Sequence, residues 1–311
     1  MKTASSYGAL AVALALAATL SPELALAAGD QAAGASGALE GAPRPSRADY
    51  PVIAGISART LAWGLAQMHL FLAAFVLSVP IFSICTEFMG VVTRDDRYDV
   101  MSREFMKITM AAYSLTALVG GGLLLALFVF YPHLMGYLLK VFRGQMLIYA
   151  LLFGLESITL YLYFYSWDAL RRGNRKWFHM SIGLVLNTVG LTLMFVANAW
   201  ATFMMSPAGV DAAGAITGTV WEATRNPLWN PLNLHRFLAN IAYGGAIVGA
   251  YAAYMFLAEK KAEVRAHYDW MGYTSNFIAI IGFLPLPFAG YWLMAEIYAY
   301  SQQMGITAMG G

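Results

Sequence analysis

Long apolar stretches separated by short charged clusters make up most of the chain after about residue 55. Each stretch can cross a bilayer core of about 30 Å as a helix, which takes roughly 20 residues. Membrane strands need only about 9–11 residues, so these lengths predict helices rather than a barrel. The fold expected for residues 55–302 is therefore an all-α bundle of six transmembrane helices, with spans at 56–91, 103–131, 137–170, 177–205, 234–259 and 268–300.

Pro285 and Pro287 interrupt the last apolar stretch. Proline removes a backbone donor and bends a helix, so a kink is expected there. The first and last spans exceed the length that a bilayer requires, which predicts tilting or protruding ends.

The first 28 residues have the pattern of a cleavable signal peptide. Lys2 precedes an apolar core, and Ala25-Leu26-Ala27 forms a small-x-small cleavage site. An uncleaved additional helix is the alternative. Residues 29–54 are rich in Ala, Gly and Pro without an apolar period, which predicts a flexible exported linker. Cleavage would place the mature N-terminus outside.

Basic residues provide an independent test of this topology, because they favour the cytoplasmic side of a membrane. With the N-terminus outside, the exported loops carry only Lys140, Arg143 and Arg225, with Arg236 at a helix start. Both signals predict a multi-pass protein of the bacterial inner membrane with both termini outside. The loops that become cytoplasmic carry Arg94, Arg97, Arg103, Arg171, Arg172, Arg175, Lys176, Lys260, Lys261 and Arg265.

Composition supports a lipid environment. The chain has 311 residues, of which 59% are hydrophobic and 12% are charged, whereas soluble domains carry about a quarter charged residues. A net charge of +2 is too small to indicate nucleic-acid binding. The single cysteine, Cys85, excludes a disulfide framework and is expected to be a buried, inert thiol.

Three histidines fall at similar depth toward the predicted outer face: His69 inside the first span, His133 after the second and His235 at the start of the fifth. Neutral imidazole is a common axial ligand of haem iron, so these are candidate haem b ligands. Arg236 lies at the same level, where it can pair with anionic haem propionates. For a histidine at a helix end, a solvent-facing interfacial side chain is the alternative. Without a CxxCH motif, attached c-type haem is excluded.

Glu156 lies in the middle of the third span, where an ionised carboxylate is costly. It is therefore expected to be protonated or paired, as in proton conduction or quinol chemistry. A neutral acid bonded to a neighbouring helix is the alternative. His179, near the cytoplasmic face, is a second candidate for proton movement or interhelical hydrogen bonding.

Motifs across four spans resemble subunit I of the bd-type quinol oxidases. Leu-Glu-Ser at 155–157 is followed by Trp-Asp at 167–168, His-Met at 179–180 and Val-Ala-Asn-Ala-Trp at 196–200. The order and spacing are similar to the N-terminal half of the family, from about residue 58 to 257. The resemblance implies a haem-binding respiratory subunit in which His69 is the first-helix ligand of a high-spin haem.

Two positions depart from that family. A second family glutamate falls at Ile148, and the low-spin haem histidine falls at Ala239, for which His235, one turn away, is a substitute candidate. The family's quinol-binding loop and further haem ligands lie beyond the six spans. We therefore expect a component of an oxidoreductase rather than a complete oxidase.

Three functions remain open from the sequence. The first is a haem b subunit that passes electrons between ubiquinol or menaquinol and partner redox subunits, including other membrane subunits and exported cytochrome c. The second is a haem-free scaffold that anchors an exported redox complex. A transporter or channel is the third, although no inverted repeat supports it.

Overall fold

The computed structural model describes residues 52–53 and 55–309, so the predicted signal peptide and nearly all of the predicted linker lie outside the described residues. A short hairpin, β1 (Val52–Ile53) and β2 (Ile56–Ser57), leads into the first long helix. The described helices are α3 (Ala58–Thr93), α4 (Arg97–Phe130), α5 (Pro132–Tyr165), α6 (Trp167–Leu170), α7 (Arg175–Phe203), α8 (Val220–Thr224), α9 (Trp229–Ala258), α10 (Ala262–Phe283), α11 (Leu286–Tyr300) and α12 (Gln302–Met309).

Six helical segments in this part of the chain are long and apolar enough to cross a membrane, which confirms the predicted spans. The last of them, Ala262–Tyr300, is broken between α10 and α11 at Pro285, so the predicted kink is confirmed. The predicted start of the second span at 103 is too late, because α4 already begins at Arg97. Its first turn is polar, and an apolar pattern does not reveal a helical turn outside the lipid core.

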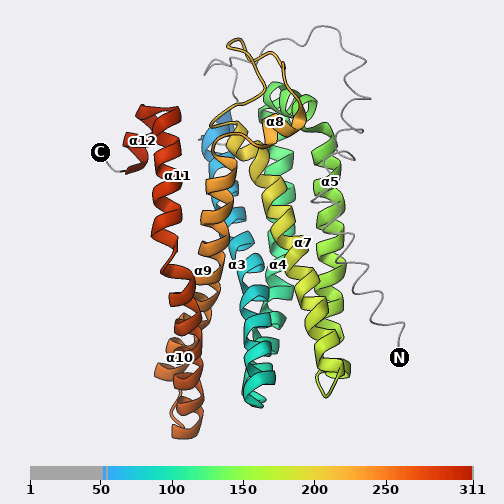
Figure 1. The fold of residues 1–311 in the computed structure, drawn as a ribbon, viewed down its shortest axis with the longest axis vertical. Coiled ribbons are helices and arrows are strands. Elements are labelled where there is room, and N and C mark those ends of the chain that lie inside the picture. The colour runs from blue at the N-terminus through green and yellow to red at the C-terminus, as the bar shows by residue number, and fades with distance from the viewer. Residues whose placement is uncertain (1–51, 54, 310–311) are drawn as a thin grey trace.

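The bundle has two ends (Figure 1). We call the first the α8 end, where the start of α3, the α4–α5 and α7–α9 connections and α12 lie. The second is the basic end, formed by the α3–α4, α5–α7 and α9–α10 connections, which carry most of the predicted cytoplasmic arginines and lysines. Both ends of the described chain lie at the α8 end, as an even number of crossings requires.

Helix α3 is central and packs against α4, α7 and α9. Phe82 and Glu87 of α3 face the interior, whereas Cys85 between them is exposed on the outside of the bundle. The prediction of a buried thiol is therefore wrong. The apolar run that contains Cys85 faces lipid on one side, and lipid exposure leaves no polar signal in the sequence.

Glycines allow α9 to touch its neighbours at the backbone. A Cβ on Gly244 would lie 2.7 Å from the Ser78 carbonyl oxygen of α3, and one on Gly245 would lie 2.5 Å from the Ala279 nitrogen of α10. Small residues promote such close helix packing in membranes. Helices α3, α9 and α10 thus form a tightly joined unit.

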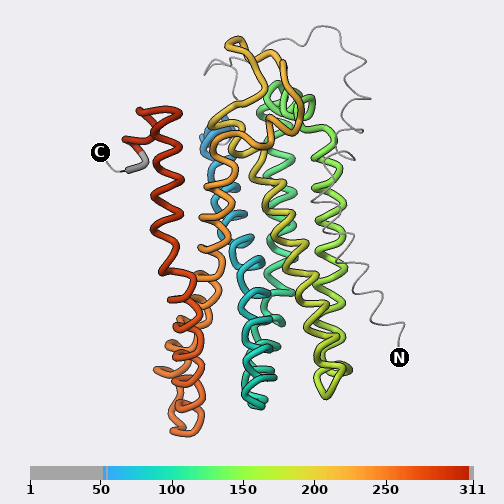
Figure 2. Tube along the Cα trace, in the orientation of Figure 1, coloured from blue at the N-terminus to red at the C-terminus, as the bar shows by residue number. Residues whose placement is uncertain are grey.

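The α7–α9 connection folds over the α8 end of the bundle (Figure 2). Thr219 and Glu222 form a capping box at the start of α8. The buried Asn226 amide donates to Thr202 Oγ1 at 2.9 Å and to the Ala223 carbonyl oxygen at 3.0 Å. On the other side, the Tyr137 hydroxyl donates to the Gly214 carbonyl oxygen at 2.8 Å. These bonds fix the connection to both α5 and α7.

Candidate functional site

A cavity of about 490 Å³ lies among α3, α4, α5 and α7, with one contribution from α9. Most of its walls are aliphatic and aromatic, and small residues of α3 and α7 leave the space open. This volume falls in the range of about 300–1,000 Å³ that is typical of cofactor and small-molecule sites. The polar side chains at its walls are those of His69, Tyr113, Thr116, Tyr149, Glu156, Asn198 and Arg236.

His69 is held against α4. Its Nδ1 lies 3.2 Å from the Thr116 carbonyl oxygen, which can only accept a hydrogen bond, so Nδ1 carries the proton. Its ring lies over Gly120, where a Cβ would come within 2.6 Å of Cε1. In the neutral ring Nε2 then keeps its lone pair, and Nε2 has no hydrogen-bond partner among the described residues. A backbone carbonyl that fixes the tautomer in this way is typical of a metal-binding imidazole.

Arg236 provides a positive charge at the same cavity. Its guanidinium donates to Asn198 Oδ1, and the Asn198 amide donates in turn to Asn233 Oδ1 at 2.7 Å. Within the described residues, no carboxylate pairs with Arg236. A partly buried cation without a counter-ion favours a ligand that brings its own anionic group.

The structure does not bring the other two candidate histidines to this cavity. His235 packs against α11, where a Cβ on Gly290 would lie 3.5 Å from its Nδ1. That nitrogen is buried and has no hydrogen-bond partner in the described chain. His133 is exposed in the first turn of α5. The three imidazoles therefore lie on three different surfaces.

Ile148 and Ala239, the two positions that depart from the bd family pattern, lie elsewhere in the bundle. Ile148 packs in an apolar cluster with Leu152 and Val189. Ala239 lines a separate, open groove of about 540 Å³ formed by α3, α9, α10 and α11. Neither position presents a polar side chain to the cavity at His69.

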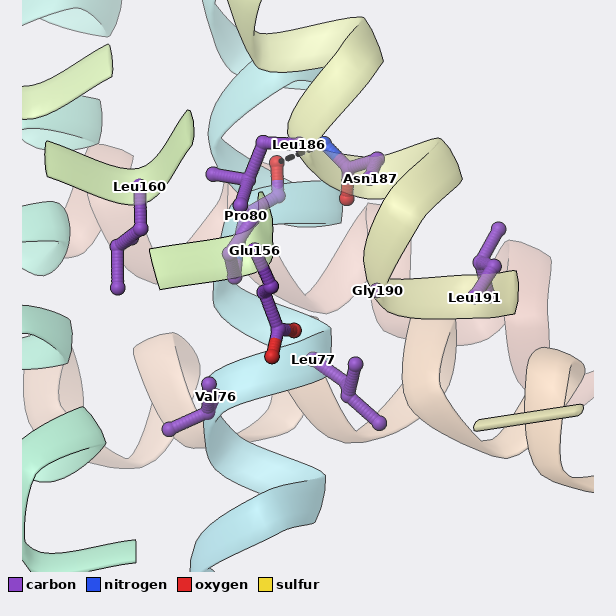
Figure 3. A pocket seen from close by; sticks show the side chains of 9 residues that line it. All are labelled: Val76, Leu77, Pro80, Glu156, Leu160, Leu186, Asn187, Gly190 and Leu191. Carbon is purple, nitrogen blue, oxygen red and sulfur yellow. Dashed lines mark hydrogen bonds between the residues drawn. The ribbon is translucent and has the colours of Figure 1, made fainter. Parts of the chain in front are cut away.

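Glu156 lies at the inner limit of the cavity (Figure 3). It is buried, with 5% of its surface exposed, and its carboxyl group makes no hydrogen bond to any described residue. A Cβ on Gly190 would lie 3.0 Å from its Oε1, so the absence of a side chain on α7 makes room for the carboxyl group. Glu156 also lines a much smaller void shared with Pro80 and Asn187.

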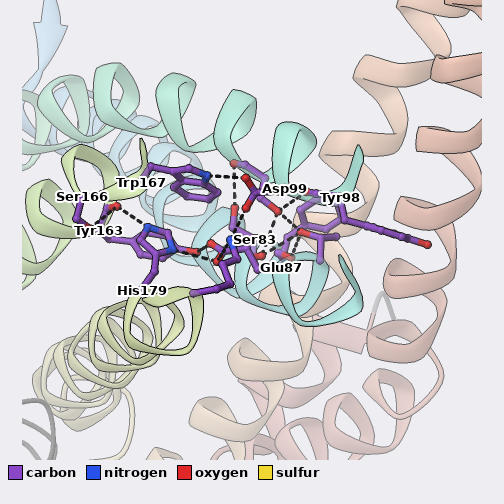
Figure 4. A network of polar contacts seen from close by, with 12 residues as sticks. Ser83, Glu87, Tyr98, Asp99, Tyr163, Ser166, Trp167 and His179 are labelled. Carbon is purple, nitrogen blue, oxygen red and sulfur yellow. Dashed lines mark hydrogen bonds and ion pairs between the residues drawn. The ribbon is translucent and has the colours of Figure 1, made fainter. Parts of the chain in front are cut away.

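A buried ionic network lies toward the basic end (Figure 4). Glu87 is at its centre: Oε2 lies 2.6 Å from Lys176 Nζ and 3.0 Å from His179 Nδ1, and Oε1 accepts from the Tyr163 hydroxyl. Lys176 also pairs with Asp99, which accepts from Trp167 Nε1 at 3.1 Å. We call these six residues the Glu87 network.

Both ring nitrogens of His179 face oxygen atoms. Its Nε2 lies 2.9 Å from the Tyr163 carbonyl oxygen and must donate, because a carbonyl only accepts. Its Nδ1 faces the carboxyl group of Glu87, which also contacts Lys176 and the Tyr163 hydroxyl. Lys176 contacts both Glu87 and Asp99, and such ion pairs offset part of the cost of burying these groups together.

Sequence reasoning identified His179 but not the network around it. Glu87 lies near the end of a span, where placing a carboxylate costs little free energy. Lys176 and Asp99 resemble ordinary charged residues of loops. A usable signal exists: Glu156, Tyr163 and Trp167 share one face of the α5–α6 segment, and Lys176, His179 and Gly183 share one face of α7.

Known proteins share this sequence and fold. The profile of the family described as cytochrome bd terminal oxidase subunit I matches residues 58–311. The putative cytochrome bd menaquinol oxidase subunit I of Bacillus subtilis (strain 168) is 25% identical over 213 residues, which cover 67% of this chain and 46% of the relative. The bd oxidase structure from Geobacillus thermodenitrificans has a TM-score of 0.71 at 17% identity, over 78% of this chain and 56% of that chain.

The chain thus spans about half the length of each of these two relatives. The family profile nevertheless covers α3 and every described helix after it, and the resemblance inferred from the motifs at Glu156, His179 and Asn198 is confirmed. The chain therefore belongs to the cytochrome bd terminal oxidase subunit I family.

Proposed function

We propose that this chain binds haem b in the cavity beside His69 and passes electrons between the quinol pool and partner redox subunits. The observation that carries the proposal is the state of His69: its Nδ1 faces a backbone carbonyl and its Nε2 is without a partner in the described chain, at the wall of an apolar cavity. That is the form of imidazole that binds iron.

The other residues of the cavity fit the same group. Arg236 has no carboxylate partner among the described residues and suits the carboxylates of a haem. The apolar walls suit its ring and exclude water. A haem bound there supplies one-electron redox chemistry. The protein's own contribution is to orient the ring through His69, to neutralise its carboxylates through Arg236, and to hold or release a proton at Glu156.

His235 and His133 lie outside this cavity, so the proposal assigns the iron ligand to His69 alone. The quinol is ubiquinol or menaquinol; the relative from Bacillus subtilis is named as a menaquinol oxidase subunit. Other membrane subunits and exported cytochrome c subunits are the proposed partners. In this arrangement the chain works as one component of an oxidoreductase.

A haem-free membrane scaffold is the second candidate. The observation that favours it is Ala239, which lines an open groove at the position where the family pattern has a haem-binding histidine. Spectroscopy separates the two functions. In the reduced-minus-oxidised spectrum of the purified chain, a haem b subunit shows a b-type alpha band, and His69→Ala removes or shifts that band. A featureless wild-type spectrum leaves only the scaffold.

We further propose that a signal peptide over residues 1–28 is cleaved and that the α8 end faces the exported side. The basic residues at the opposite end support this orientation, because they favour the cytoplasm. An alkaline phosphatase fused after the last residue should be active, and one fused in the α5–α7 connection near Gly173 inactive. The reverse pattern would overturn the orientation.

A further inference from the structure

A hollow of about 550 Å³ lies on the α5–α7 connection, at the basic end of the bundle (Figure 1). Its walls come from α6, from the turn that follows it and from the first residue of α7. Gly173 allows this turn, because its φ of +60° is a left-handed conformation that favours glycine. The lining residues are Asp168, Ala169, Arg171, Arg172, Asn174 and Arg175.

The three arginines of the hollow have no counter-ion in the described part of the chain. Arg171, Arg172 and Arg175 are exposed, and none of them pairs with a described carboxylate. Asp168 is the one carboxylate among the lining residues, and it already pairs with Arg103 of α4. The hollow therefore presents three positive charges that nothing described neutralises.

The other two connections at the basic end do not concentrate charge in this way. In the α3–α4 connection, two arginines accompany three aspartates between residues 94 and 99. In the α9–α10 connection, three basic residues accompany two glutamates between residues 259 and 265. A general preference of basic residues for the cytoplasmic side does not require their grouping around one hollow. The grouping at the α5–α7 connection therefore favours a local anion site.

The start of α7 adds to the positive potential of the hollow. No side chain caps this helix of 29 residues, and its first turn contains no acidic residue. The N–H groups at the start of a helix carry partial positive charge and bind anions such as phosphate. Asn174 and Arg175 line the hollow, so the uncapped start of α7 borders it.

Exposed aromatic rings place the hollow beside lipid. Tyr165, the last residue of α5, is 72% exposed, and Trp177, in the first turn of α7, is 54% exposed. Tyr161 stacks on Tyr165 with 6.0 Å between the ring centroids. Exposed Tyr and Trp at the ends of membrane helices lie at the level of the lipid headgroups. The phosphate groups of lipids are therefore found at the depth of the hollow.

We propose that this hollow binds the phosphate group of an anionic phospholipid. Guanidinium groups match the oxygen atoms of a phosphate with paired hydrogen bonds, and basic pockets between membrane helices hold such headgroups. A zwitterionic lipid carries its own ammonium group, which neutralises its phosphate, so the three arginines favour a lipid without a headgroup cation. The site is separate from the cavity at His69 and does not depend on whether that cavity holds haem.

Native mass spectrometry of the purified full chain in detergent, titrated with phosphatidylglycerol, tests the proposal. The variant combines Arg171→Gln, Arg172→Gln and Arg175→Gln. The usual contribution of one basic residue near an anionic membrane corresponds to about fivefold in affinity. The triple variant should therefore bind phosphatidylglycerol about 100-fold more weakly than the wild type. Its melting temperature should stay unchanged, because all three side chains are exposed.

A second triple variant is the matched control. Lys260→Gln, Lys261→Gln and Arg265→Gln remove the same charge from the α9–α10 connection, which carries its own glutamates. This variant should bind phosphatidylglycerol as the wild type does. Phosphatidylethanolamine with the same acyl chains is the second probe and should bind the wild type more weakly than phosphatidylglycerol. Inorganic phosphate should not displace bound phosphatidylglycerol.

Four outcomes would overturn the proposal. Equal loss of binding in the two triple variants would show diffuse attraction to the whole basic end. Equal binding of the two lipids to the wild type would show that the headgroup charge is not recognised. Displacement of the lipid by inorganic phosphate would make the hollow a site for soluble phosphate. Unchanged binding in the arginine variant would leave the hollow to an acidic segment of a partner protein.

Discussion

The glycine beneath His69 allows a sharp test of the proposed haem site. Gly120→Ala adds one methyl group to α4, directly under the imidazole ring. The new Cβ would lie 2.6 Å from Cε1 and 2.9 Å from Nδ1. Gly121→Ala is the matched control, because a Cβ on Gly121 meets nothing within 4 Å. Both changes favour a helix by up to about 1 kcal/mol, so neither should unfold the protein.

The size of the effect follows from these distances. Carbon atoms in ordinary contact are about 3.5–4.0 Å apart, so the ring must retreat by about 1 Å. Binding groups need to be held within about 0.5 Å of their productive position. The retreat also lengthens the 3.2 Å contact between Nδ1 and the Thr116 carbonyl. Losing such an outer partner typically weakens metal binding by about 10–100-fold, so we expect a loss of that order for haem.

The assay is haem titration of the haem-depleted protein, followed by absorbance, with melting temperature as the folding control. Gly120→Ala should bind haem about 10–100-fold more weakly than Gly121→Ala, at similar melting temperatures. Equal affinity in the two variants would refute the idea that the ring over Gly120 is the haem ligand. His69→Ala sets the baseline for loss of the ligand.

Three more outcomes are expected. Lys176→Met leaves Glu87 and Asp99 without the cation that they share, so it should lower the free energy of unfolding in detergent by about 3–5 kcal/mol. Arg103→Gln, which breaks an exposed ion pair with Asp168, should lower the free energy of unfolding by about 1 kcal/mol or less. Asn226→Ala should increase protease cleavage of the α7–α9 connection, because buried acceptors lose their donor; cleavage at the wild-type rate would contradict this. The hydrogen bond from Arg97 lowers the pKa of Asp95 from its usual value of 3.8. The pair therefore stabilises the folded state above that pH, and this contribution is lost as the pH falls through the lower pKa of the folded state. Arg97→Gln should therefore remove that acid-side contribution in melting curves, and unchanged curves would show that the pair contributes nothing.

The sequence predicted the spans and the broken last helix because lipid imposes a strong and local requirement for apolar residues. It also singled out His69, Glu156 and Arg236, since each polar group inside a span is exceptional. The same logic failed for Cys85, because lipid-facing and core-facing residues are equally apolar.

Groupings of residues were harder to predict than single residues. Equal depth suggested that His133 and His235 would join His69, but depth does not determine which way a helix face points. Arg236 faces the cavity whereas its neighbour His235 faces α11, since adjacent helical positions differ by about 100°.

The glycine contacts of α9 divide the bundle into a stiff part and a more compliant part. Where Gly244 and Gly245 bring backbones together, a small relative shift produces a steric clash, so α3, α9 and α10 can only move as one body. Helices α4 and α5 pack less extensively against each other, and both border the cavity. A side chain at Gly244 or Gly245 would therefore force α9 away from α3 or from α10.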